Sequence, residues 1–438
     1  MSKEFIDDKI EHIESDIEKI RRKPNMYISY LGTKGSLHLC KEIINNAIDE
    51  CINPNSPAKN ISIYVDEIDN VITVTDDGRG IPFDKIETVC SYIQAGSKFE
   101  REYGTTSGEN GVGITACRAL SNLFSITSIR NGQKGFMKWV DSQADKKLSV
   151  KAVSGDEHGT TVCFSPSPQY MGECDIPVDE LLAWLDNISF LIPKEITINF
   201  TSQSKGKESS IRKKFKNKNG LEDYINRVDR TNATDIVSLS NSIGFKEKFK
   251  GVMRDRVLNL EFAFVYSADG AEEVSDCFCN FTHNIDKGVH YNAVKQALTQ
   301  YFINATKESL SERDAKKIDI VVNDCSQGLL IAINLFTDAD LMFSGQTKEK
   351  VGNTELFKPI KQMALNMLIE FFNKEPKELK RITDVIKNNA KARIKSLEVR
   401  NSVLKGETSN LDEHRISSFI PCSNGRGQYK ELFLIEGK

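Results

Sequence analysis

The chain has 438 residues, of which 39% are hydrophobic and 28% are charged, and its formal net charge is −3. A net charge so close to zero excludes a global electrostatic attraction to nucleic acid, so any such contact has to come from local patches. The ten cysteines are scattered and no apolar run reaches the length of a membrane span, which predicts a reduced, cytoplasmic protein without a membrane partner.

Residues 1–20 are rich in charge and carry isoleucines at intervals that suit a helix. We therefore predict an N-terminal helical segment. It is either an arm that reaches beyond its own domain or a helix solvated on that domain, and the residue pattern leaves both open. The isoleucines are Ile6, Ile10, Ile13, Ile17 and Ile20.

A longer amphipathic helix is predicted from Leu37 to Cys51, where apolar residues recur at helical spacing. The residues Glu42, Asn46 and Asp49 follow one another at i, i+4 and i+7 and so project from one side of this helix. A solvated face would tolerate them. A site that needs a general base and a ligand for a hard cation explains them better, because a carboxylate can accept a proton and an amide oxygen can bind magnesium.

The segment Val71–Pro82 combines a strand with a tight turn. The strand alternates, so Ile72, Val74 and Asp76 share a face that is apolar until it reaches the acid. A carboxylate at a core-facing position needs hydrogen-bond donors, because leaving it without them costs roughly 1–3 kcal/mol. The glycine-rich turn lets a ligand approach the backbone. This suits a ligand with an amino group, such as adenine, although a strand that simply ends in an Asp-Gly turn gives the same pattern.

A glycine-rich loop is predicted just before a helix that runs from Ile114 to Leu120. Its glycines are Gly108, Gly111 and Gly113, which expose backbone N–H groups to phosphate oxygens. The loop lacks the Gly-Lys-Ser/Thr of a Walker motif, and a loop of this kind is more often a turn than a site.

Changes in composition predict further parts after the N-terminal segment. Residues 21–218 are expected to form a mixed α/β domain that closes with a polar, basic stretch from Ser204 to Gly220, a hairpin tip or a boundary. A second α/β domain is expected over residues 219–400, and residues 401–438 follow it. The helical run from Asp384 to Lys405 is basic, which suits a solvated linker helix and a DNA-facing helix equally.

Taken together, these elements resemble the GHKL ATPase superfamily, and within it the B subunits of the type IIA topoisomerases, DNA gyrase and topoisomerase IV. Other segments are similar to that family in the family's order along the chain, and such collinearity is far more specific than one motif. These segments are Arg22–Ile28, Gln94–Phe99, Gly159–Val162, Phe281–Leu298, the triplet Gln346-Thr347-Lys348, and Glu431–Lys438.

The resemblance implies an α+β protein. A GHKL (Bergerat) α/β sandwich, the ATPase domain, would be followed by an α/β transducer domain with a ribosomal-protein-like βαβ fold. Residues 401–438 would be a linker and the first strand of a TOPRIM domain, so the chain is expected to be a truncated or split subunit. In the family an arm comparable to residues 1–20 wraps the partner subunit.

The implied function is that of an ATP-gated, dimerising N-terminal part of a type IIA topoisomerase, which drives DNA strand passage. The implied partners are a second copy of the chain, an A-type subunit that carries the cleavage tyrosine, and double-stranded DNA. This part alone would hydrolyse ATP but not cut DNA.

The resemblance also implies roles for single residues, with ATP and Mg²⁺ as cofactors. Glu42 would be the general base, Asn46 the one protein ligand of Mg²⁺, and Asp76 the acceptor for the adenine amino group. Lys348, also catalytic, would place its ammonium on the γ-phosphate. The residues expected to contact ATP are Asn46, Asp49, Glu50, Asp76, Arg79, Gly80, Ile81, Pro82, Lys98, Tyr103, Gly108, Gly111, Val112, Gly113, Thr160, Gln346 and Lys348.

Two arginines are expected to support this pocket, Arg79 by pairing with Glu50 and Arg130 at the rim. The chain departs from the family at Glu109 and Asn110, where the usual pattern is Gly-Leu-His-Gly-Val-Gly. An acid at this place would weaken phosphate binding or point to solvent.

Related ATPases remain as alternatives. A mismatch-repair protein of the MutL type shares the nucleotide motifs and a lysine in the second domain, while heat-shock chaperones share the fold and sensor histidine kinases the nucleotide site. The Gln-Thr-Lys triplet and the terminal Leu-Ile-Glu-Gly argue against all three. An alternative of a different class is a nucleotide-gated clamp that binds ATP without turnover. The sequence does not separate gyrase, topoisomerase IV and a phage enzyme.

Overall fold

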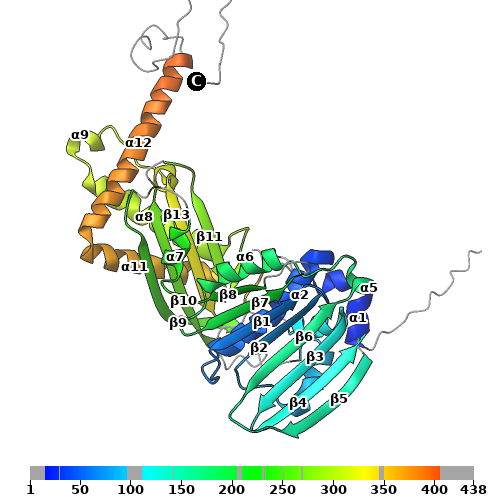
Figure 1. The fold of residues 1–438 in the computed structure, drawn as a ribbon. Coiled ribbons are helices and arrows are strands. Elements are labelled where there is room, and N and C mark those ends of the chain that lie inside the picture. The colour runs from blue at the N-terminus through cyan, green and yellow to red at the C-terminus, as the bar shows by residue number, and fades with distance from the viewer. Residues whose placement is uncertain are drawn as a thin grey trace, which may run out of the picture.

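Two β-sheets organise the described residues, one in each half of the chain (Figure 1). The computed structural model describes residues 15–28, 30–95, 111–141, 143–204, 210–228, 231, 233–249, 251–267, 270–344 and 350–404. No helix in this part of the chain has the length and apolarity that a membrane span requires.

The first sheet has eight strands in the order β5-β4-β3-β6-β2-β1-β7-β8. They are β1 (Asn60–Asp66), β2 (Val71–Asp76), β3 (Ser121–Arg130), β4 (Gln133–Val140), β5 (Gln143–Ala152), β6 (Gly159–Pro166), β7 (Thr197–Gln203) and β8 (Ile211–Phe215). Strand β2 lies inside the sheet between β1 and β6, and it alternates as predicted, with Ile72, Val74 and Asp76 buried. Strands β7 and β8 pair in antiparallel register on either side of the basic stretch that was expected to be a hairpin tip or a boundary, and residues 205–209 of that stretch lie outside the described residues.

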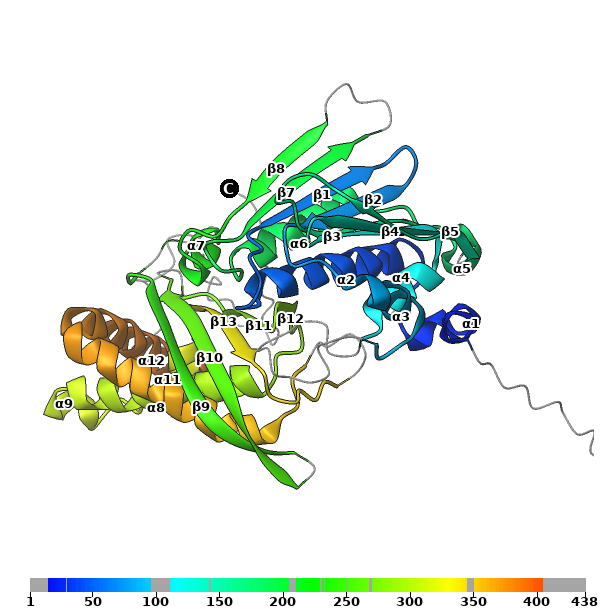
Figure 2. The same cartoon turned by 90° about the horizontal axis from the view of Figure 1, so that it is seen from below.

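Helices cover one face of this sheet, on the side where the second half of the chain lies (Figure 2). They are α1 (Asp16–Arg22), α2 (Gly32–Ile52), α3 (Ile86–Ser91), α4 (Gly113–Ala119), α5 (Pro168–Met171) and α6 (Val178–Ser189), with short 3-10 turns at Pro24–Met26 and Phe83–Lys85. The apolar stripe of α2 includes Leu39, Ile43 and Ala47 and is buried in the same core as the inner residues of β2. Burial of a leucine or isoleucine side chain contributes roughly 1.5–3 kcal/mol, so this stripe fixes α2 across the sheet.

Helix α1 packs against the body of the chain. Its residues Ile17 and Ile20 are buried, and the guanidinium of Arg21 donates to the Ala119 carbonyl at 2.8 Å and lies over the ring of Tyr170. Of the two interpretations of residues 1–20, a helix resting on its own domain therefore describes Asp16–Ile20. Residues 1–14 of the predicted arm, which was expected over residues 1–20, lie outside the described residues.

The second sheet has the strand order β12-β11-β13-β10-β9. Strands β11 and β13 are parallel and α8 crosses between them, which is the βαβ unit expected of the second half. The strands are β9 (Val237–Phe249), β10 (Val252–Tyr266), β11 (Val274–Cys279), β12 (Thr282–His283) and β13 (Leu329–Thr337). The helices are α7 (Leu221–Asn226), α8 (Val289–Ser309), α9 (Glu312–Ala315), α10 (Val322–Ser326), α11 (Phe357–Lys374) and α12 (Pro376–Leu404), with a 3-10 turn at Thr354–Leu356.

The two faces of the second sheet have different neighbours. One face packs on α8 and α11 through an aromatic cluster that includes Phe264, Phe302 and Phe372. The other face joins the core of the first half: the ring of Tyr224 on α7 lies edge-on both to Phe278 of β11 and to Phe190 of the first half, each at 5.6 Å between ring centroids. One apolar core therefore continues across the junction of the two halves.

Candidate active site

A cavity of about 1200 Å³ lies between α2, the turn after β2, α6 and the turn that follows β11. Its volume exceeds the roughly 300–1,000 Å³ that is typical of small-molecule sites. Many of the predicted site residues line it: Glu42, Asn46, Glu50, Asp76, Arg79, Gly80, Ile81, Pro82, Gly111, Val112, Gly113 and Thr160. The structure thus brings together residues that are far apart in the sequence, and their roles stay predictions.

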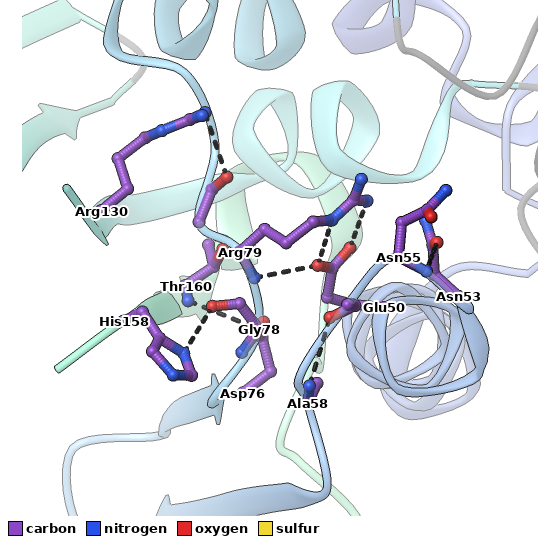
Figure 3. Close-up of polar contacts among 12 residues, drawn as sticks. Glu50, Asn53, Asn55, Ala58, Asp76, Gly78, Arg79, Arg130, His158 and Thr160 are labelled. Carbon is purple, nitrogen blue, oxygen red and sulfur yellow. Dashed lines mark hydrogen bonds and ion pairs between the residues drawn. The ribbon is translucent and has the colours of Figure 1, made fainter. Parts of the chain in front are cut away.

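Asp76 stands at the end of β2 and lines the cavity, and Figure 3 shows it beside Gly78 and Thr160. Its Oδ1 accepts hydrogen bonds from the backbone N–H groups of Gly78 at 2.9 Å and Thr160 at 3.3 Å. Only 7% of the residue is exposed, and burial raises its pKa to about 7, against the pull of these two donors. A carboxyl group that titrates near neutral pH and faces a cavity is an acceptor that gains from a ligand donor.

The turn after Asp76 is held by side chains from three directions. Arg79 donates from Nε to Oε1 of Glu50 at 2.8 Å and from Nη2 to Oε2 at 2.9 Å, while its backbone N–H donates to Oε1 at 2.9 Å (Figure 3). Burial alone would raise the pKa of Glu50, but these hydrogen bonds outweigh it and hold the pKa below its usual value. The Ser128 hydroxyl donates to the Ile81 carbonyl at 2.7 Å, and Arg130 reaches the Gly80 carbonyl at 3.5 Å. The predicted pairing of Arg79 with Glu50 is present.

We expect Arg79→Ala to weaken ADP binding about five- to tenfold and to lower the free energy of unfolding by about 1–2 kcal/mol. The change removes two charge-assisted hydrogen bonds that hold the turn, and it leaves Glu50 half-buried without its cation. Calorimetric titration and urea unfolding would measure the two effects. An Arg79→Lys chain is the matched control: it keeps the charge but loses the bidentate fit, so it should recover only part of the affinity. Equal affinities for all three chains would contradict a positioning role for this pair.

The carboxylate of Glu42 lies on α2 against the first turn of α4. A Cβ added at Gly113 would overlap Oε2 of Glu42, so a larger residue at this position would push the Glu42 carboxylate aside. On the same face of α2, Nε2 of His38 lies 3.8 Å from Oε1 of Glu42. His38 was not predicted as a site residue, although its position four residues before Glu42 is the signal that could have revealed it.

Asp49 and Asn46 have different surroundings on α2. Asn46 is half-buried and lines the cavity, whereas Asp49 is 4% exposed and is not among the lining residues. Helical spacing gave the side of the helix on which Asp49 stands, but it did not show that this side is covered near the C-terminal end of α2. Contact between Asp49 and ATP stays a prediction that the cavity lining does not support.

Several predicted site residues lie outside the described residues. They are Lys98, Tyr103, Gly108, Gln346 and Lys348. The ends of the segment that carries the Gln-Thr-Lys triplet are described: the Ser344 N–H donates to the Lys350 carbonyl at 3.1 Å, and Phe343 forms an antiparallel bridge with Val351.

The second half of the chain supplies part of the cavity wall, which sequence reasoning missed. Phe278, Phe281, Thr282, His283 and Ile285 all line the cavity, at the turn between β11 and α8. They follow the α2 residues by more than two hundred positions, and no pattern in the sequence indicates that they meet. Only packing of the second sheet on the first half brings them there.

Two family models match the chain. The family described as "Histidine kinase-, DNA gyrase B-, and HSP90-like ATPase" matches residues 34–169, and the one described as "DNA gyrase B" matches residues 220–402. The first match contains α2 except for its first two residues, the turn after β2 and the start of α4, and the second match contains the whole second sheet. Each half of the fold is thus matched by its own family model.

Curated relatives match the chain almost from end to end. The topoisomerase 4 B subunit of Mycoplasma genitalium is 29% identical and the DNA gyrase B subunit of Thermotoga maritima is 28% identical, each over 96% of this chain. The chain spans 65% of the length of each of these relatives.

Solved structures share the fold. The 43K ATPase domain of Thermus thermophilus gyrase B, in complex with an aminocoumarin, has a TM-score of 0.69 at 22% identity and covers 88% of this chain and 97% of its own. The ATPase and transducer domains of DNA topoisomerase II from Balamuthia mandrillaris have a TM-score of 0.64 at 16% identity, over 89% of this chain and 100% of their own. The predicted fold class is confirmed by these shared folds, and the chain is similar along almost its whole length to B subunits of DNA gyrase and topoisomerase IV.

Proposed function

We propose that this chain binds ATP in the cavity beside α2, hydrolyses it, and uses the cycle to open and close a dimer gate. The observation that carries the proposal is the convergence of Glu42, Asn46 and Asp76 on one cavity, opposite the glycines of the α4 turn. Asp76 would accept from the adenine amino group. Guanine presents a carbonyl at that place, so two acceptors would face each other and ATP should be preferred to GTP.

Glu42 would act as the general base. Its carboxylate faces the cavity next to the Gly113 backbone, where it would accept a proton from the water that attacks the γ-phosphate. His38, four residues earlier, stands close enough to orient that carboxylate. Lys348 would stabilise the charge that develops on the phosphate oxygens, with Gln346 donating alongside.

Mg²⁺ fits this donor set with Asn46 as its one protein ligand. Within the described residues no group of three histidine, cysteine, aspartate or glutamate side chains could hold a metal ion. A single amide oxygen suits Mg²⁺, which keeps several waters and takes its remaining ligands from phosphate oxygens. When bound, the ion would neutralise charge on the phosphates.

The larger assembly is proposed on the similarity to B subunits of topoisomerase IV and DNA gyrase, of whose length the chain spans 65%. From these relatives we infer a topoisomerase that comprises a homodimer gated by ATP and an A-type subunit that carries the cleavage tyrosine, with double-stranded DNA as the molecule acted on. We place this assembly in the cytoplasm.

One experiment tests the gate and the ATPase together. ATP turnover is measured against protein concentration, and the molar mass is measured by sedimentation with and without a non-hydrolysable ATP analogue. We expect turnover per chain to rise with concentration and the analogue to convert monomer to dimer. Turnover that is independent of concentration, without an analogue-driven dimer, would remove the gate and leave the ATPase. Absence of nucleotide binding would reject both.

A further inference from the structure

The cavity continues around α2, beyond the face that carries Glu42 and Asn46. A second stripe, Lys34, Lys41 and Asn45, also lines it. Because each residue advances about 100° around a helix, Lys41 and Asn45 point roughly a quarter-turn away from Glu42 and Asn46. We call the part of the cavity that is bounded by this stripe, by α6 and by the turn after β11 the second compartment.

Lys41 is the principal charge of this compartment. Its side chain is half-buried, and its Nζ lies 5.5 Å from the centroid of the Trp184 ring. Burial lowers the pKa of Lys41, and the charge of Glu180 acts in the opposite direction. No ion pair joins Lys41 to another residue of the described part of the chain, although Glu180, which is exposed, also lines the cavity. A half-buried cation without a carboxylate against it gains from an anionic ligand.

Apolar and aromatic groups form the remaining walls. Trp184 lies on α6, and from the second half come Phe281 and the exposed Ile285. His283 stacks on Phe278 with ring centroids 4.9 Å apart, and its Nε2 lies 3.1 Å from Oδ1 of Asp276, so its ring is held in place at the rim. Flat ring surfaces of this kind favour a planar ligand.

An unused acceptor lies between the two compartments. Oδ1 of Asn45 is buried and has no hydrogen-bond partner within the described part of the chain. Buried polar atoms normally have a partner, so an unpaired oxygen in a cavity wall indicates a donor that arrives with a ligand. Lys41 and Asn45 are one helical turn apart, so one molecule can meet both.

We propose that this second compartment binds a planar aromatic anion, such as an aromatic carboxylate or sulfonate, next to the nucleotide and independently of it. The anionic group would pair with Lys41, the ring would stack on Trp184, and a ring N–H or hydroxyl would donate to Asn45. The combined volume of about 1200 Å³ leaves room for this ligand beside a nucleotide. Because residues of both halves line the compartment, the ligand would touch both.

The test uses 8-anilinonaphthalene-1-sulfonate as the probe, on the full chain. The chain has two tryptophans, and Trp139 is buried in the first core, so Trp139→Phe leaves Trp184 as the only donor for energy transfer to the dye. We expect one dye molecule to bind with strong transfer from Trp184 and to remain bound in saturating ADP and Mg²⁺. Lys41→Met should lower the affinity for the dye at least tenfold, and Lys41→Arg should keep most of that affinity. Lys85 is an exposed lysine that also lines the cavity, and Lys85→Met should leave the affinity for the dye unchanged.

Three results would overturn the proposal. They are complete displacement of the dye by ADP, absence of energy transfer from Trp184, and equal dye affinity in the unchanged and Lys41→Met chains. The energy-transfer measurement needs no change at Lys41, so the site can be rejected even if Lys41→Met does not fold. Binding of ADP is measured separately by calorimetry. If ADP does not bind, the proposed ATPase function is rejected. The dye measurements on the unchanged and Lys41→Met chains still show whether the second compartment binds an anion.

Discussion

Glu42→Ala is expected to reduce ATP turnover at least 100-fold and to leave the affinity for a non-hydrolysable ATP analogue within about threefold of its original value. A positioned general base contributes roughly 10²- to 10⁴-fold to a reaction rate, and its loss removes stabilisation that exists only in the transition state. Glu42 lines the cavity, and its carboxylate lies directly against the Gly113 backbone at the start of α4. Phosphate release and calorimetric titration measure the two quantities.

The control for Glu42→Ala is Glu87→Ala, an exposed acid on α3 outside the cavity lining, which should keep full turnover. Turnover that survives in Glu42→Ala would contradict the assignment of the base. If the unchanged chain binds the analogue but releases no phosphate, the protein is the nucleotide-gated clamp and not an ATPase. His38→Ala adds a finer test, since loss of orientation should lower turnover without changing the affinity for the analogue.

Asp76→Asn is expected to weaken ADP binding roughly 10- to 100-fold and, in the opposite direction, to stabilise the empty protein. A hydrogen bond to a charged acceptor contributes about 1.5–3 kcal/mol, which gives the loss of affinity. The asparagine oxygen can still accept from the N–H groups of Gly78 and Thr160, so the turn should persist. Calorimetry and thermal unfolding of the same preparations measure both effects. A chain that loses affinity and stability together would show a structural defect instead.

The pH dependence of both quantities follows from the pKa of Asp76, which is about 7 in the folded chain against an ordinary value of 3.8. The folded chain holds this proton more tightly than the unfolded chain, so Asp76 lowers stability as pH rises from about 4 to 7, by roughly 4 kcal/mol in total. The stabilisation by Asp76→Asn should therefore grow over this range and then level off. A ligand that donates to the carboxylate needs it ionised, so ADP affinity should fall roughly tenfold per pH unit below 7 in the original chain. In Asp76→Asn this dependence should vanish.

Local pattern predicted the parts of the site that one segment can encode. The alternation of β2 placed Asp76 on the buried face, whereas the pairing of Arg79 with Glu50, 29 positions apart, was expected from the family resemblance. Spacing along α2 likewise placed Glu42 and Asn46 on the cavity side. These inferences succeed because the geometry of a strand or a helix fixes the direction of a side chain regardless of what packs on it.

The sequence was least informative where distant segments meet. The apolar repeat predicted that α2 begins at Leu37, whereas the helix begins at Gly32. The prediction missed the first turn because that turn is polar and carries no apolar repeat. It could not show that Asp49 is covered, nor that Phe278 and His283 would reach the cavity. Each of these facts depends on which surface packs against the element, and a helical or strand repeat does not identify that surface.

The continuous core at the junction has a practical consequence for anyone who dissects this protein. Ala263, Val265, Phe278 and Leu330 belong to the second sheet, yet they are buried in the core of the first half. A fragment that ends near residue 218 would leave the residues opposite them open to water, and exposed apolar patches promote aggregation. Such a fragment would also lack the part of the cavity wall that the second half supplies, so nucleotide binding measured on it would not represent the complete cavity. The intact chain is therefore the appropriate material for inhibitor screening.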